Sequence, residues 1–454
     1  MHTETTQPST QASTLSWHAL TLPQMDFWEE FDLHPDEPLS TVAHYIELTG
    51  PVDLDALCQS IEAAVRETDV LALTFRKDPQ SGQVQQAISE PHYPIVKVID
   101  LSENETPLAK ARTLMEDELK QPINLYHDKL SAQWVIKLAD DHYLWYLRAH
   151  HIIMDGFGMT LLEQRCATWY AHFQAGQDCG RPFNRLNQFL SEENAYQSSP
   201  LHQQSQQFWH HYLQQPNSVT ALDKADDYEE ESVALSARLD TPFSQTLIDA
   251  AKFYGIAWAD LLVVLSGLYL HHHLSAKYCP HDDPLTLWVP FMSRWGSVGA
   301  YMPGMMVNIL PFTLSVDESA PLHQQVKHHS QALRQLYRHG RFRIEQMAKD
   351  QGIKNNHRYF FSPFINVLPF DPPAFHQCET THHVLTSGPA DGFNLTFRGQ
   401  TNGYGLSMSL DSDASLHPET EMLDHQNNLM TFLQRCFKPS NAEQKLHDLF
   451  SPQR

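Results

Sequence analysis

Two adjacent histidines, followed by an aspartate and a glycine, are the residues of this chain best suited to catalysis. They stand in the heptapeptide His150-His151-Ile152-Ile153-Met154-Asp155-Gly156. An imidazole titrates near neutral pH, so a histidine held in a cleft can exchange a proton with a substrate or hydrogen-bond to it. Asp-Gly is also a common turn dipeptide, and taken alone it indicates only a turn. The full spacing rarely arises by chance.

The flanking elements would position these side chains at the end of a strand. The aromatic, apolar run at 143–147 is typical of a strand, and the run at 159–175 has the apolar spacing of a helix. Asp155-Gly156 would form the turn between them. Since successive strand residues point to opposite faces, only one of the two histidines can face a cleft, and the other must be packed.

Further segments resemble, in the same order along the chain, the motifs of condensation domains of nonribosomal peptide synthetases and of acyltransferases that share their fold. The sequences of these segments most resemble the condensation domain of enterobactin-type siderophore synthases. Besides the heptapeptide they are 20–24 with Trp28, 42–50, 66–71, 289–294, 303–311, 339–345, 361–367 and 387–391. The resemblance runs from about residue 18 to about residue 440.

This resemblance implies an α/β (α+β) fold with two chloramphenicol-acetyltransferase-like lobes. The lobes would form a V with a central tunnel, and the histidine motif would lie in that tunnel. We expect a disordered N-terminal tail at 1–17, a first lobe at 18–175, a linker at 176–184 and a second lobe at 185–454. The linker coincides with a break in composition around Gly176, Gly180 and Pro182.

The resemblance also assigns roles to the two histidines. We predict that His151 faces the tunnel and is the catalytic residue, while His150 packs behind it. His151 would either remove a proton from an attacking amine or hydrogen-bond the amine and the tetrahedral intermediate, and the sequence does not separate these roles.

Four further residues are predicted to support His151. Asp155 would be structural and would pair with an arginine of the second lobe, for which Arg294 is the candidate. Gly156 would let the backbone approach the substrate closely. Asn308 would support the segment that crosses over the tunnel.

The sequence departs from the family pattern in the second motif, and the residues after Asp-Gly argue against epimerisation. An arginine usual in the second motif is replaced by Ala72, so a salt bridge of that region is absent or replaced. After Asp-Gly the chain reads Phe157-Gly158-Met159-Thr160 rather than the Val-Ser-Trp-Arg of epimerising relatives, which favours condensation.

Composition indicates a large soluble enzyme and excludes several other classes. The chain has 454 residues, of which 41% are hydrophobic, but no apolar run long enough to span a bilayer and no signal peptide. The net charge of −23 argues against nucleic-acid binding and would favour a cationic substrate such as a polyamine. Six scattered cysteines suit a reducing cytoplasm, where we expect the protein.

No bound cofactor or metal ion is expected. The triplet at 271–273 is all histidine, but adjacent residues of a helix point in different directions and cannot converge on one ion. We expect these residues to form the polar end of a buried helix at 259–270.

The predicted activity is amide formation by a free-standing condensation enzyme. The sequence contains no phosphopantetheine attachment motif, so the acyl group would arrive as a phosphopantetheine thioester on a separate acyl or peptidyl carrier protein. The acceptor would be a small amine, such as a soluble polyamine, or an amine on a second carrier. Three alternatives stay open: an acyl-coenzyme A-dependent acyltransferase of the same fold, an ester-forming enzyme, and an inactive docking module.

Overall fold

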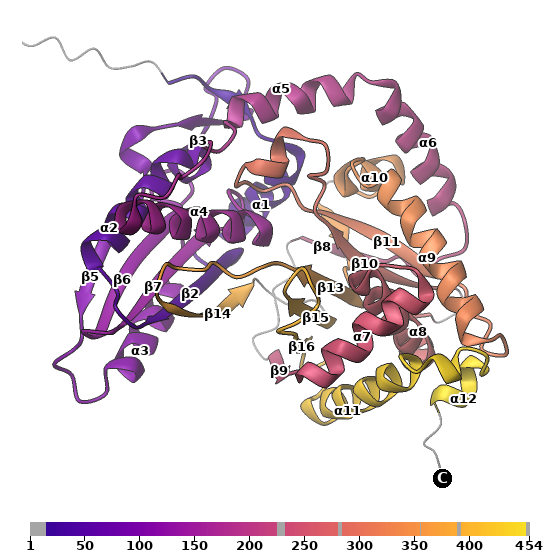
Figure 1. Cartoon of the computed structure of the whole chain (residues 1–454). Coiled ribbons are helices and arrows are strands. Elements are labelled where there is room, and N and C mark those ends of the chain that lie inside the picture. The colour runs from indigo at the N-terminus through magenta and orange to yellow at the C-terminus, as the bar shows by residue number, and fades with distance from the viewer. Residues whose placement is uncertain (1–14, 225–231, 280–283, 355, 388–391, 451–454) are drawn as a thin grey trace, which may run out of the picture.

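The structure is a computed structural model in which residues 15–224, 232–279, 284–354, 356–387 and 392–450 are described. Most of the predicted tail at 1–17, and residues 388–391 of the motif at 387–391, lie outside the described residues. Two large sheets stand side by side, one in the N-terminal half and one in the C-terminal half (Figure 1).

The first large sheet has five strands in the order β14-β2-β7-β6-β5, and only the β5–β6 pair is parallel. Its alternating residues feed two different cores, because neighbouring side chains point to opposite faces. Val42, Ile46 and Trp145 pack with helices α2 and α4, whereas Tyr45 and Tyr146 pack with α3. The strands are β2 (Thr41–Thr49), β5 (Val96–Asp100), β6 (Ser131–Ala139), β7 (His142–His150) and β14 (Glu379–Ser387). The helices of this half are α1 (Leu22–Leu33), α2 (Leu54–Glu67), α3 (Pro107–Leu119) and α4 (Gly156–Ala175).

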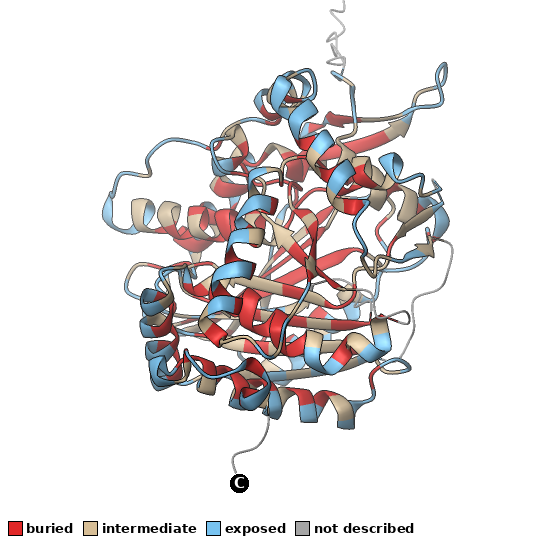
Figure 2. Ribbon diagram, turned by 90° about the vertical axis from the view of Figure 1, so that its right-hand side faces the viewer, coloured by how far each residue is buried: buried red, intermediate tan, exposed pale blue. Residues whose placement is uncertain are grey.

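The second large sheet has six strands in the order β11-β10-β13-β15-β16-β9, with parallel pairs at β10–β13 and β13–β15. Its core is built around α8, which is buried along most of its length. Figure 2 shows buried residues mainly in the interior of the molecule and exposed residues on its outer helices and loops. The strands are β9 (Ser232–Arg238), β10 (Leu285–Phe291), β11 (Asn308–Leu314), β13 (Phe364–Pro369), β15 (Phe393–Gly399) and β16 (Ser407–Asp413). The helices are α5 (Leu186–Gln197), α6 (Pro200–Leu213), α7 (Thr241–Tyr254), α8 (Trp258–Tyr278), α9 (Leu322–Arg338), α10 (Ile344–Asp350), α11 (Glu419–Cys436) and α12 (Leu446–Phe450).

Smaller elements complete the described part of the chain. A three-stranded sheet joins β1 (His18–Ala19), β4 (Val84–Ile88) and β3 (Leu73–Lys77), and a two-stranded sheet joins β12 (His357–Tyr359) and β8 (Ala221–Asp223). Short 3-10 helices are η1 (Asp69–Ala72), η2 (Glu90–His92), η3 (Val298–Tyr301) and η4 (Pro439–Asn441).

The chain crosses back from the second half to the first. Strand β14, late in the sequence, pairs with β2 from Glu379–Thr49 to Ser387–Val42 and so forms the edge of the first sheet. Met302, Met306 and Phe375 also belong to the core of the first half. The second half therefore holds the first sheet from one edge, while the boundaries at 176–184 stay predictions.

Local predictions agree with the structure, with two shifts at helix ends. The predicted strand at 143–147 lies within β7, and the predicted helix at 159–175 starts earlier, at Gly156, because Asp155 caps it. Helix α8 runs to Tyr278, past the three histidines, since the buried Leu274 continues its apolar face. In the described part of the chain no single helix meets the length and hydropathy needed to cross a membrane. Only α7 and α8 together do, and they are bent by 92°.

Candidate active site

A cavity of about 1590 Å³ lies between the two large sheets, where the tunnel was predicted. The first half contributes His151, Asp155, Gly156 and residues of β2 to its wall. The second half contributes residues of β9, β10, β13, β15 and β16, and β14 closes one side. The histidine motif therefore faces a space that is bounded by both halves of the protein.

His151 is the histidine of the pair that lines this cavity. It follows directly after β7, and its backbone N–H donates to the carbonyl oxygen of Ser40 (2.6 Å). Its ring stacks on Phe27 of α1, with 5.2 Å between the ring centroids and 9° between the planes. Nδ1 is buried and makes no hydrogen bond of normal geometry among the described residues, although backbone groups of His151 and Met154 lie close enough to act on the ring. Nε2 is then the nitrogen available to a substrate.

Burial lowers the pKa of His151 below its usual value of 6.5, and the negative charge of Asp155 opposes this only in part. The imidazole is therefore neutral at neutral pH. A neutral imidazole can accept a proton from an amine, and in its other tautomer it can donate a hydrogen bond.

His150 is packed rather than exposed to the cavity. It ends β7, its side chain is buried, and its Nδ1 accepts a hydrogen bond from the backbone N–H of Ile152 (3.1 Å). Burial is the main cause that lowers its pKa to about 3, and the positive charges of Arg148 and of His151 when protonated act in the same direction. His150 is thus a neutral acceptor that shapes the turn, and the two histidines separate as the strand geometry requires.

Asp155 and Arg294 form a fully buried ion pair that joins the two halves. Arg294 Nη2 lies 2.8 and 2.9 Å from the two carboxylate oxygens. Asp155 also accepts from the backbone N–H groups of Gly158, Met306 and Val307 (2.8, 2.9 and 2.9 Å). The carboxylate caps α4 and holds the segment that precedes β11, so its oxygens are occupied and not free for substrate.

The other contacts of Arg294 fix the same segment. Its Nη1 donates to the carbonyl oxygens of Gly299 and Met302 (2.7 and 2.6 Å), and its Nη2 also donates to that of Gly304 (2.9 Å). The arginine therefore gathers the loop between β10 and β11 around Asp155, directly beside the turn that carries His151.

Gly156 lines the cavity, and its predicted close approach to the substrate stays a prediction. Within the protein, a close backbone approach occurs two residues later. A Cβ at Gly156 would meet nothing within 4 Å. A Cβ at Gly158 would lie 3.0 and 3.2 Å from the backbone nitrogen and oxygen of Gly304, and 2.9 Å from Cγ of Met154. Gly158 is thus the glycine that allows α4 to cross the loop held by Arg294, and the sequence did not single it out for this.

We expect Gly158→Ala to destabilise the protein and Gly156→Ala not to. Overpacking against backbone costs about 1–3 kcal/mol, whereas alanine in open space near a helix start costs little. Urea unfolding of both variants measures the difference in the free energy of unfolding. Equal stability of the two variants would show that the crossing at Gly304 is not tight.

Asn308 lies at the start of β11 and points away from the cavity. Its Nδ2 donates to the carbonyl oxygens of Gly340 and Phe342 (both 2.8 Å), and its Oδ1 accepts from the N–H of Ile344 (3.0 Å). All its hydrogen bonds fix the segment before α10. The structure does not bring it to His151, and its predicted support of the crossing segment stays a prediction.

The position of the missing arginine is apolar. Ala72 is fully buried in the core of the first half. The ion pair that ties this region to α4 joins Glu67 to Arg165, with Oε2 to Nε at 2.6 Å and Oε1 to Nη2 at 2.7 Å.

Two residues of the cavity wall, Phe27 and Asp411, were not among the site residues predicted from the sequence. Phe27 precedes the recognised Trp28 but gave no sign that it would stack on His151. Asp411 of β16 faces the cavity, and no hydrogen bond or ion pair is found for its carboxylate among the described residues. Burial raises its pKa to about 6. Only the register of β16 with β15 and β9 could have placed it there.

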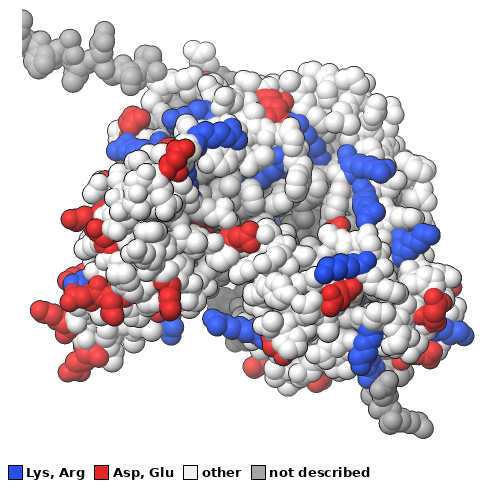
Figure 3. Space-filling model, in the orientation of Figure 1, with Lys and Arg blue, Asp and Glu red and all other residues white. Residues whose placement is uncertain are grey.

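Acidic and basic side chains are interspersed on the face shown in Figure 3, without a continuous basic stripe. Binding of a nucleic-acid backbone requires such a stripe.

Comparison with known proteins identifies the class to which this fold and site belong. A family model described as "Condensation domain" matches residues 18–454, so the chain belongs to the condensation domain family. The solved structure of VibH, an NRPS condensation enzyme, superposes with a TM-score of 0.83 at 36% identity. The match covers 95% of this chain and 99% of VibH. The predicted α/β fold with chloramphenicol-acetyltransferase-like halves is confirmed by this match.

The curated relatives are much longer proteins. The Dimodular nonribosomal peptide synthase of Bacillus subtilis (strain 168) is 29% identical over 421 residues, which cover 92% of this chain and 17% of that protein. Enterobactin synthase component F of Escherichia coli (strain K12) is 26% identical over 395 residues, 86% of this chain and 30% of that protein. The chain thus spans less than a third of the length of these relatives. The family match and the likeness to VibH make it an acyl-transferring enzyme of the condensation type.

Proposed function

We propose that the protein acts as a condensation enzyme that forms an amide by transferring an acyl group from a carrier-protein thioester to an amine. The observation that carries this proposal is the neutral, cavity-lining imidazole of His151 between the two halves. The match to VibH, an NRPS condensation enzyme, over 95% of this chain and 99% of that one supports condensation chemistry at this site.

In the proposed reaction the amine nitrogen attacks the thioester carbonyl, and the carbon–sulfur bond breaks once the tetrahedral intermediate has formed. The proton lost by the amine passes to the departing thiolate, directly or through Nε2 of His151. Holding the two reactants in one cavity could supply much of the acceleration. Asp155, Arg294 and His150 act through position, because all three are buried in contacts with the protein.

The acceptor proposed here is a soluble amine that carries a second positive charge, such as a polyamine. Asp411 supports this choice, since its carboxylate faces the cavity and has no hydrogen-bond or ion-pair partner among the described residues. A pKa of about 6 leaves it ionised at neutral pH. Asp411 is half-buried, and desolvation of its ionised carboxylate is costly. An ammonium group of the substrate would relieve that cost.

Asp411→Asn should raise the KM for a diamine or polyamine and leave the KM for a monoamine nearly unchanged. A hydrogen bond to a charged group contributes about 1.5–3 kcal/mol, which corresponds to roughly 10- to 150-fold in KM. Steady-state kinetics with paired mono- and diamines measure the effect. Asp413→Asn is the matched control, because Asp413 lines the same wall but already accepts from the N–H of Ser415 (2.7 Å). Equal effects on both amines would exclude Asp411 as the anchor.

The nature of the acceptor is tested by supplying one acyl-loaded carrier with a panel of free amines and, separately, with a second aminoacyl-loaded carrier. Turnover with free amines supports the soluble acceptor. Turnover only with the second carrier would exclude it and leave the condensation activity in place.

A coenzyme A thioester is the second candidate donor. A variant of the starter condensation domain of rhizomide synthetase RzmA was solved in complex with C8-CoA. It superposes with a TM-score of 0.81 at 25% identity, over 95% of this chain and 96% of that one. The same acyl group offered on a carrier and on coenzyme A separates the two donors. We expect a higher kcat/KM with the carrier, and the reverse order would assign the protein to the acyl-coenzyme A-dependent enzymes.

A further inference from the structure

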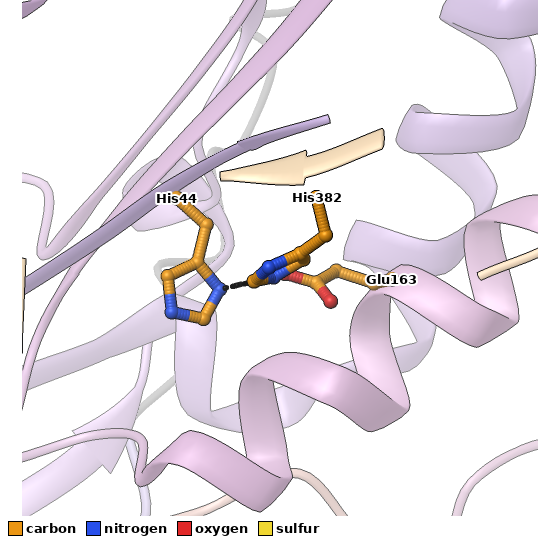
Figure 4. A group of neighbouring side chains, drawn as sticks. All are labelled: His44, Glu163 and His382. Atoms are coloured by element: carbon orange, nitrogen blue, oxygen red, sulfur yellow. Dashed lines mark hydrogen bonds and ion pairs between the residues drawn. The ribbon is translucent and has the colours of Figure 1, made fainter. Parts of the chain in front are cut away.

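Three side chains on one wall of the cavity form a compact group that the proposed reaction does not use. They are His44 of β2, Glu163 of α4 and His382 of β14, and they point toward one another (Figure 4). His44 Nδ1 lies 2.8 Å from Glu163 Oε1 and 3.1 Å from His382 Nε2, and His382 Nε2 lies 3.3 Å from the same Oε1. All three contacts thus close a triangle of two nitrogens and one oxygen.

Protons alone cannot satisfy all three contacts of this triangle. A ring nitrogen either donates or accepts, and an ionised carboxylate only accepts. If both nitrogens donate to Glu163, the nitrogen–nitrogen contact of 3.1 Å joins two donors and has no acceptor. If one nitrogen donates to the other, the accepting nitrogen turns a lone pair toward the carboxylate. One contact therefore stays repulsive in every protonation state that keeps the carboxylate ionised.

A metal ion at the centre would use all three lone pairs at once. Zinc binds imidazole nitrogen and carboxylate oxygen at about 2.0–2.2 Å with tetrahedral geometry, which places ligand atoms about 3.3 Å apart. The three distances here, 2.8 to 3.3 Å, need only a small expansion. Among the described residues this is the one group of three such ligands that lies close enough together.

We propose that His44, Glu163 and His382 bind a divalent transition-metal ion, with zinc as the expected ion. His44 and His382 line the cavity while Glu163 is buried behind them, so the fourth position of the ion would open to the cavity. The ion would fasten β14 to β2 and to α4, the helix capped by Asp155. This site is independent of the proposed function.

Arg398 competes with the metal ion. It lines the same cavity, and its charge acts on both His44 and Glu163. Because like charges repel, a metal ion must bind against this guanidinium. Removing the charge by Arg398→Met should therefore lower the Kd for the metal ion. If the three side chains formed only a hydrogen-bonded cluster, this variant would not change the binding of a metal ion.

The test uses the full chain without an affinity tag, stripped with a chelator and titrated with Zn²⁺ or Co²⁺ alone. We expect one equivalent of Zn²⁺ per chain in competition with a chromophoric chelator, a rise in Tm on binding, and visible absorption typical of four-coordinate cobalt. Glu163→Gln and His382→Ala should each weaken binding by more than about 100-fold. His382 is the safer second variant if Glu163→Gln fails to fold, because its side chain is 12% exposed.

His383→Ala is the matched control. His383 neighbours His382 on β14, and its Nε2 lies 3.0 Å from Oε2 of Glu47. The other carboxylate oxygen of Glu47, Oε1, lies 2.7 Å from Nε2 of His142. This variant should bind Zn²⁺ like the wild type. Absence of a stoichiometric ion in the wild type, or equal binding by the wild type and the His382→Ala variant, would overturn the proposal.

Discussion

His151→Ala should lower amide formation by at least about 10²–10⁴-fold while the protein stays folded. This is the range that a positioned acid, base or hydrogen-bonding group contributes to catalysis. The side chain lines the cavity and no side chain among the described residues hydrogen-bonds to its Nδ1, so its loss strands no partner side chain. Rates of product formation by mass spectrometry, with circular dichroism of the purified variant, test both parts.

His150→Ala is the paired variant and should behave differently. It removes a buried ring and the acceptor for the N–H of Ile152, so it should lower stability or soluble yield. A well-folded but inactive His150→Ala protein, together with an active His151→Ala protein, would reverse the assignment of the two faces.

The pH dependence of kcat/KM tests the protonation state of His151. With a weakly basic amine that stays unprotonated, the acid limb of kcat/KM should reflect this imidazole. Because burial lowers its pKa, the limb should have its midpoint below 6.5, and activity should persist at pH values where free histidine is protonated. A midpoint at or above 6.5 would contradict the buried, neutral state of His151.

Removing either partner of the ion pair between Asp155 and Arg294 should cost about 3–5 kcal/mol of stability, because the remaining charge is stranded in a buried site. Both side chains are 3% exposed. Asp155→Asn keeps the shape of the side chain but loses the charge, and Arg294→Gln shortens the donor. Urea unfolding of the two single variants and the double variant measures the losses.

The double variant decides whether the two residues act as a pair. Direct contact predicts that the double variant loses clearly less than the sum of the two single losses. Strictly additive losses would mean that they do not interact. Arg148 is not an alternative partner, since its guanidinium is bound to Glu118 and to the carbonyl oxygen of Gln121.

Local features of the site could be predicted from the sequence because short-range rules determine them. Alternation along β7 separates His150 from His151, and the turn chemistry of Asp155-Gly156 predicts the start of α4. The partner of Asp155 lies 139 residues away. It was predicted only through the resemblance to condensation domains, and the structure brings Arg294 to it.

Features that depend on sheet register could not be predicted. Strand β14 joins β2 across more than 300 residues, and that pairing alone brings His382 to His44. Asp411 faces the cavity because of how β16 pairs with its neighbours. The sequence drew attention instead to the histidines at 271–273, which lie on α8 and are not part of a compact three-ligand group among the described residues.

Transfer of an acyl group from a carrier thioester to an amine at His151 is tested most directly by intact mass spectrometry. Acyl-loaded carrier proteins are incubated with the wild-type protein and amine. We predict that the acyl mass leaves the carrier in step with the appearance of the amide, and that both nearly stop with His151→Ala. Carriers that keep their acyl groups with every amine and second carrier, or that lose them equally fast with both proteins, would contradict the account.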